Sequence, residues 1–428
     1  MAFQSYFPIL SNRYLCKSFK GYAGNSTDID QLFRRECDFK GVVGIFCLYL
    51  GVFLRASADV LIHAYLPFYF LNHMGETRVW VIGFFLGIPA LVRLTVSPFW
   101  GRYVARVNHP KIFFAGGLLA YAVFFHRLPG LQNPGEVVVA ASSAALFTSI
   151  FNPGSRGWLL QNFPLDGLKY LAFWHQWEAA GYLLSSIAIG WVVNNGYMEL
   201  AQIPPIFGML LAIGALFTGV FLPKPKRSAS HFICSSKMKA SKRICTYDKG
   251  VIIPYGALGY LLTSSLTWEV VATTFGLYYI GLLGGTMKLY GLLIGSATFV
   301  SLFAYGVLAP LCQKRGHYLV FKLASWGYTA MYLLMAYPSV PTASFGYLMP
   351  MSSVVRTAIN GVVTNQVAET HQGAALGIVD SIEAGSIAWG AILGGMIAHH
   401  RGLAFIPKLA LFSSVLLHIL APRTKGRW

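Results

Sequence analysis

The chain has 428 residues, of which 55% are hydrophobic and only 11% are charged, and its mean hydropathy is +0.56. Soluble domains carry roughly 25% charged residues, so this composition disfavours a water-soluble enzyme. The formal net charge of +18 does not indicate a nucleic-acid partner, because most of the 33 Lys and Arg residues fall between apolar runs. A basic excess in loops is typical of an integral membrane protein.

The N-terminal segment 1–40 is polar and mixed in charge, and its few apolar residues form no uninterrupted core of the kind that a signal peptide needs. We therefore expect it to be a cytosolic tail. Segment 422–428 is expected to be a second cytosolic tail at the other end.

Apolar stretches long enough to span a bilayer, about 20 residues each, recur from Gly41 to Ala421. They predict an all-α integral membrane protein with an N-terminal six-helix bundle (41–222), a basic linker (223–250) and a C-terminal six-helix bundle (251–421). The twelve predicted transmembrane helices are 41–71, 79–100, 112–128, 136–161, 168–194, 203–222, 251–282, 286–311, 319–337, 341–365, 374–398 and 403–421.

The distribution of Lys and Arg predicts the orientation. With both termini inside, and with residues near span ends counted in the adjacent loop, 24 of these residues fall in inner segments, five in outer loops and four within spans. Cytosolic loops carry the excess of positive charge in membrane proteins. We therefore expect a multi-pass protein of the cell membrane (a bacterial inner or plasma membrane) whose termini and linker are cytosolic.

Charged residues inside the spans recur at a nearly constant offset, which indicates a duplicated six-helix unit with pseudo-symmetric halves. Asp59 corresponds to Glu269, 210 residues further on, and Arg156 to Arg356, 200 further on. Glu178 is matched with Asp380 at an offset of 202.

Several short motifs keep their order along the spans: SPFWGRYVAR at 97–106, FNPGSR at 151–156 and QGAALG at 372–377. Together with the twelve spans, they resemble the major facilitator superfamily, in style closest to its drug/proton antiporter branch. The resemblance covers the chain from about residue 41 onward. It implies two bundles that alternate access to a central site.

In that family, the loop after the second span carries charges that lock the inner face. The corresponding residues here are Gly101, Arg102 and Arg106, but Ala105 stands where the family has an acid. The Gly-Pro pair that marks the fifth span of proton-driven exporters is absent from residues 181–190. Both departures count against the usual inner gate and the export mechanism.

Away from the span ends, five acids and four arginines lie within the predicted spans, where each unpaired charge costs at least roughly 2.5–3.5 kcal/mol. They must therefore pair or line a water-filled cavity. Arg55 and Asp59, four residues apart, are spaced for a local ion pair. We expect Asp59, Glu178 and Glu269 to face a shared central cavity, with Arg156 and Arg356 nearer its cytosolic end.

The coupling candidates, in order, are Glu178, Asp380 and Glu383, followed by Asp59 and Glu269. A semi-buried acid can take up a proton from one side and release it to the other. The aromatic pair Trp174 and Trp177 beside Glu178 is suited to an organic ligand. Arg156 and Arg356 either clamp a carboxylate or phosphate or extend to the membrane surface. Trp80, Tyr197, Tyr290 and Trp428 lie near span ends and are expected to be interfacial anchors.

These features predict a secondary transporter that moves a small organic solute, coupled to protons and acting as a monomer. No Gly-Lys-Ser/Thr loop indicates a nucleotide, and His231, Cys234 and Cys245 match no zinc pattern, so no cofactor or metal is expected. Neither His-Glu-x-x-His nor Gly-x-Ser-x-Gly indicates an enzyme. Export of a drug-like compound or metabolite is favoured. Nutrient uptake, lysolipid flipping and a non-transporting receptor or assembly factor are the alternatives.

Overall fold

The structure is a computed structural model that describes residues 39–104, 110–163, 167–222, 255–366 and 372–421. These residues are helical throughout apart from turns, as backbone groups in lipid require. The predicted twelve spans are confirmed. They are α3–η2–α4 (Phe39–Val60, Leu61–Tyr65, Leu66–Asn72), α5 (Val79–Val104), α6 (Pro110–Arg127), α7–α8 (Pro134–Thr148, Phe151–Asn162), α9 (Gly167–Asn194), α10 (Ile203–Phe221), α12–η6 (Tyr255–Leu277, Tyr278–Leu282), α13 (Met287–Arg315), α14 (His317–Ala336), α15–α16 (Val340–Leu348, Met351–Gln366), α17 (Gln372–Arg401) and α18 (Phe405–Leu420).

Seven of these spans, among the residues that the structure describes, are long and apolar enough to cross a membrane by length and composition alone. The others are broken, shorter or more polar. The fourth span is interrupted between α7 and α8 and the tenth between α15 and α16. The second break falls at Pro350, and Pro153 lies in the first turn of α8, where a helix loses no hydrogen bond to proline.

Local structure repeats between the halves. Positive-φ glycines turn the chain after the first and seventh spans (Gly75, Gly284) and after the fifth and eleventh (Gly196, Gly402). The side chains of Asn133 and Ser339 cap α7 and α15, the first segments of the fourth and tenth spans. A π-helical segment occurs in each of the first and seventh spans, η2 and η6. These repeats support the pseudo-symmetric duplication that the sequence predicted.

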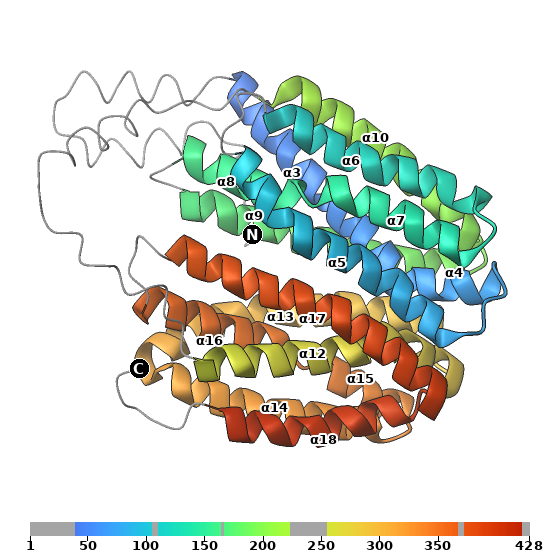
Figure 1. The fold of residues 1–428 in the computed structure, drawn as a ribbon, viewed down its shortest axis with the longest axis vertical. Helices are drawn as coiled ribbons and strands as arrows, with labels where there is room; N and C mark the ends of the chain where they lie inside the picture. Colours follow the sequence, from blue (N-terminus) through green and yellow to red (C-terminus); the bar gives the residue numbers. More distant parts are fainter. Residues whose placement is uncertain (1–38, 105–109, 164–166, 223–254, 367–371, 422–428) are drawn as a thin grey trace, which may run out of the picture.

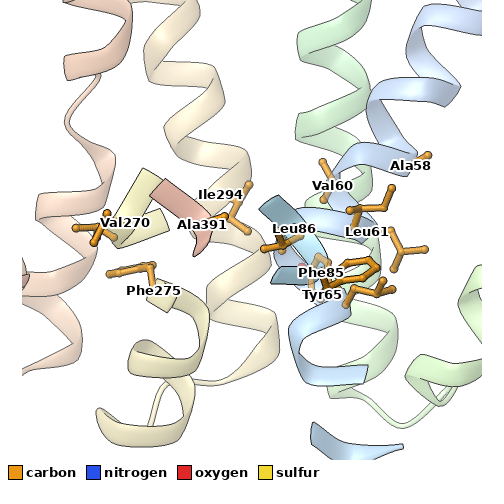
Figure 2. Packing of buried hydrophobic residues seen from close by; sticks show 14 of the residues in the cluster. Ala58, Val60, Leu61, Tyr65, Phe85, Leu86, Val270, Phe275, Ile294 and Ala391 are labelled. Carbon is orange, nitrogen blue, oxygen red and sulfur yellow. The ribbon is translucent and has the colours of Figure 1, made fainter. Parts of the chain in front are cut away.

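The first six spans form one bundle and the last six form another, and the two lie side by side (Figure 1). We call the end with the turns at Gly75, Gly196, Gly284 and Gly402 the turn end. The opposite end, where α10 finishes and α12 begins, is the linker end. The bundles meet mainly where α5 packs on α17 and α9 on α13. Figure 2 shows Ile294 on one side of this interface and Leu86 and Val60 on the other.

The turn between α4 and α5 is held by a buried carboxylate, Glu76. Its oxygens accept hydrogen bonds from the Arg78 backbone N–H at 2.9 Å and from the Arg78 guanidinium at 2.8 and 2.7 Å. The Arg78 side-chain hydrogen bonds hold the pKa of Glu76 below its ordinary value of 4.5. The charged carboxylate therefore stabilises the fold above about pH 4.5, and this contribution is lost as pH falls through the lower, folded-state pKa.

We predict that Arg78→Gln lowers the melting temperature at pH 7, because the Glu76 carboxylate loses its charged partner. The difference between wild type and variant should narrow below about pH 4.5, where Glu76 begins to be protonated. Thermal unfolding in detergent across pH 3–8 measures this. A difference that is constant over the whole range would show that the Glu76 charge is not involved.

Candidate functional site

A cavity of about 450 Å³ lies between the two bundles. Small-molecule sites generally occupy clefts of about 300–1,000 Å³, so this space suits a small organic ligand. The second bundle provides most of its wall. The first bundle contributes Val60, His63, Ala64, Leu86 and Tyr182, and the second contributes Trp268, Glu269, Ala272, Thr273, Tyr290, Ile294, Ala297, Thr298, Ser301, Met331, Tyr347, Met349, Pro350, Ser352 and Ile387.

Glu269 is the only Asp, Glu, Lys or Arg among the described residues that line this cavity. No Lys, Arg or His in the described part of the chain lies within ion-pair distance of its carboxylate. A carboxyl group so placed can be neutralised by binding a proton or by contacting a cationic ligand. The cavity therefore carries one negative site with no compensating charge from the protein.

Aromatic rings form the wall beside Glu269. Trp268 and Tyr347 have ring centroids 5.5 Å apart, and the buried Tyr290 ring contacts Tyr65 at 6.1 Å. Such rings attract cations through their electron-rich faces. The expectation that Tyr290 is an interfacial anchor is wrong, because its side chain is only 3% exposed and lines the cavity.

Glycine contacts close the turn end of the interface. A Cβ atom added at Gly83 in α5 would lie 2.5 Å from the Ala391 carbonyl oxygen and 3.0 Å from the Gly395 Cα atom in α17. The equivalent contact joins Gly190 in α9 to α13, where an added Cβ would lie 2.6 Å from the Met287 carbonyl oxygen. Only glycine lets these backbones approach so closely, so both helix pairs are sealed at this end.

Charged side chains gather inside the first bundle. Arg55 contacts Asp59 at 2.9 Å and Glu178 at 2.6 Å. Arg93 contacts Asp59 at 3.6 Å, and Tyr121 donates a hydrogen bond to Asp59 at 2.8 Å and accepts one from Arg93. The predicted Arg55–Asp59 ion pair is confirmed. Asp59 is only 3% exposed, which makes it the centre of a buried network.

The predicted shared cavity is therefore wrong for two of its three acids. Neither Asp59 nor Glu178 lines the cavity, since their carboxylates turn to the arginines of the first bundle. Glu269 alone does so. The reason is that Arg55 lies between Asp59 and Glu178, and an ion pair in a medium of low dielectric is stronger than contact with the cavity.

The remaining arginines lie toward the linker end, and each meets a carboxylate. Arg156 reaches across the interface to Asp380 at 3.9 Å, and its guanidinium stacks 4.4 Å above the Trp174 ring. Arg356 makes a two-pronged contact with Glu383 in its own bundle, one hydrogen bond being 3.1 Å long. The two arginines therefore do not form a joint clamp, and we find no ligand site between them.

The tryptophans predicted to bind substrate are part of the packing instead. Trp174 is 0% exposed and donates a hydrogen bond to Ser155 at 3.0 Å. Trp177 stacks on Tyr49 with ring centroids 6.3 Å apart. Neither lines the cavity. Sequence proximity to Glu178 does not indicate a ligand surface here, because the helix turns these rings toward other spans.

Helix register also changes one predicted correspondence. The interface glycines Gly190 and Gly395 are 205 residues apart and make equivalent contacts. The same spacing of 205 residues matches Glu178 in α9 to Glu383 in α17. The earlier match of Glu178 with Asp380 is therefore wrong. At this spacing, His175 corresponds to Asp380.

Of the predicted inner-gate residues, Gly101 and Arg102 lie in the last turn of α5, and Arg106 lies outside the described residues. Sequence reasoning missed Trp268, Tyr347 and His63 as cavity residues. Trp268 precedes Glu269, and His63 is one helical turn beyond Asp59. Closeness to an intramembrane acid is the signal that could have identified these two residues, whereas Tyr347 has no such neighbour in the sequence.

We predict that the role of Asp59 is to stabilise the folded protein. Asp59→Asn leaves Arg55 and Arg93 buried with one fewer countercharge, and should lower the free energy of unfolding by about 3 kcal/mol. Denaturant titration in detergent measures this. Glu136→Gln, at an exposed acid beside the α7 cap, is the control and should change stability much less. An Asp59→Asn protein as stable as wild type would contradict the assignment.

Comparison with known proteins agrees with this architecture. Residues 42–391 match the family model described as Major Facilitator Superfamily. No curated protein matches the sequence.

Solved structures of similar fold cover almost the whole chain. They include a bacterial homologue of the human lysosomal transporter Spinster in an inward-facing and occupied conformation (12% identity, TM-score 0.69, 88% of this chain and 94% of that chain), the nucleoside transporter NupG (12%, 0.67, 90% and 100%) and the human organic anion transporter MFSD10 (TETRAN) (14%, 0.62, 89% and 99%). At these identities, the likeness shows the fold alone. With the family match, the chain belongs to the major facilitator superfamily and is a multi-pass membrane protein.

Proposed function

We propose that this protein is a secondary active transporter that exports an amphipathic organic cation in exchange for protons, by alternating access of the central cavity. The cavity between the bundles, with Glu269 as its one uncompensated charge, carries the proposal. Because the cavity lies within a single chain, one copy is sufficient for transport.

The conformation supports alternation. Glycine contacts seal the turn end, whereas residues facing the other bundle nearer the linker end are open to solvent, Asp380 being 61% exposed. The positive-inside rule assigns the linker end to the cytosol. The structure is then an inward-facing state, in which substrate enters from the cytosol.

Glu269 supports both the substrate class and the coupling. A cation seated against Trp268, Tyr290 and Tyr347 would neutralise its carboxylate, and a proton would do the same in the absence of substrate. Since one carboxylate cannot hold both, proton binding releases the cation. We therefore propose Glu269 as the coupling residue instead of Glu178, which is already paired with Arg55.

We predict that Glu269→Gln strongly reduces exchange. The assay is flux of 1-methyl-4-phenylpyridinium, a permanent aromatic cation, in proteoliposomes with and without an imposed pH step. Wild type should accumulate the cation only with the pH step. Glu269→Gln should reduce accumulation about tenfold or more, the cost of losing a charged contact in a cavity.

The controls test charge and position separately. Glu136→Gln removes an exposed acid away from the cavity and should transport like wild type. The uncharged analogue 4-phenylpyridine should not compete with the cation. Wild-type flux that ignores the pH step would refute proton coupling, and an unimpaired Glu269→Gln variant would refute the carboxylate site.

We further predict that Gly83→Val prevents closure of the turn end, because its side chain would meet the Ala391 carbonyl oxygen in α17. A cysteine introduced at the cavity residue Ser301 should then react with a membrane-impermeant thiol reagent from the turn end. Gly116→Val is the matched control, since nothing lies within 4 Å of a Cβ atom there. Equal labelling of the two variants would show that these glycine contacts do not seal the interface.

A further inference from the structure

Outside the cavity, Arg156 occupies a place between two carboxylates in different bundles. Its guanidinium rests on the buried Trp174 ring at 4.4 Å and interacts electrostatically with both Glu178 and Asp380. The contact with Asp380 in α17 is 3.9 Å long, near the limit for an ion pair. This is the one ion pair between the bundles among the residues that the structure describes.

The second bundle shows what the equivalent arginine does. Arg356 is the sixth residue of α16, as Arg156 is of α8. Arg356 binds Glu383 of its own bundle, and Glu383 corresponds in helix register to Glu178. By pseudo-symmetry, the own-bundle acceptor for Arg156 is therefore Glu178.

In this conformation, Arg156 does not form an ion pair with Glu178. The two oxygens of Glu178 are engaged, one by Arg55 at 2.6 Å and the other by His175 at 3.3 Å. Arg156 turns to Asp380 in the other bundle instead. In register with Asp380, helix α9 has His175, which is not an acid.

We propose that Arg156 is a latch between the bundles at the linker end, with Glu178 and Asp380 as its alternative acceptors. When the linker end closes, the Arg156–Asp380 contact shortens and holds α8 against α17. When it opens further, Arg156 turns back to Glu178, as Arg356 contacts Glu383. Trp174 supports the guanidinium in both positions.

This latch supplies a link that the loop after the second span lacks, since Ala105 stands where the family has an acid. It rests on the alternating access proposed above but not on any substrate or coupling ion. The latch predicts the direction in which each substitution shifts the bundles. Removing Asp380 and removing Glu178 neutralise one acid each, yet they should shift the bundles in opposite directions.

The experiment measures distances between spin labels in the full-length protein in nanodiscs, without substrate or gradient. One label pair, at Ala172 and Asn360, reports on the linker end, and another, at Asn195 and Lys288, reports on the turn end; all four positions are exposed. Asp380→Asn should lower the ratio of linker-end-closed to open molecules about threefold, and Glu178→Gln should raise it by a similar factor, as for a partly exposed ion pair.

The charge swap Arg156→Asp with Asp380→Arg should restore the wild-type ratio, while either single change lowers it. Glu383→Gln is the matched control: it removes the equivalent carboxylate, but the α9 residue in register with Asp380 is His175 and not an acid, so the closed fraction should not rise. Elution as a single species and an unchanged helical signal establish that each variant is folded.

If Asp380→Asn and Glu178→Gln shift the ratio in the same direction, or the charge swap fails to restore it in folded protein, the latch is refuted. Because no substrate is present, that result leaves the proposed transport function standing. Conversely, loss of cation flux in Glu269→Gln bears on the transport function and not on the latch.

Discussion

The cost of charge in a membrane organises this structure. Away from the span ends, five acids and four arginines lie within the predicted spans, so the acids are in excess. The structure shows which acid has no arginine partner among the described residues. Asp59, Glu178, Asp380 and Glu383 each contact an arginine, and Glu269 does not. Since an unpaired charge is tolerated only beside water or a ligand, the cavity lies where the charges fail to balance.

The two bundles differ in what their charged and aromatic side chains do. The first holds its charges in a buried network around Asp59 and Arg55. The second provides most of the cavity wall, including Glu269 and the aromatic rings of Trp268 and Tyr347. A duplicated scaffold has thus kept its backbone symmetry, while its side chains have become a support in one half and a site in the other.

The proposed alternation depends on contacts that can separate without leaving buried polar groups unsatisfied. The turn end is closed by backbone contacts at Gly83 and Gly190, which are tight but carry no ion pair. Toward the linker end, Arg156 and Asp380 join the bundles through a long contact between side chains that are 29% and 61% exposed. Water can replace such a contact, so the bundles can move apart there at small cost.

The sequence by itself determined the twelve spans, the duplication and the balance of intramembrane charges, because hydropathy and the cost of charge act on composition and order along the chain. It also predicted the Arg55–Asp59 pair, which depends only on helical spacing. Tertiary structure decided the rest. Whether Glu178 faced the cavity or Arg55, and whether Trp174 met a ligand or Ser155, depended on how separate helices rotate against one another. That rotation is set by close packing of many side chains at once, and the close glycine contacts that fix the register of Glu178 against Glu383 are visible only when the helices are assembled.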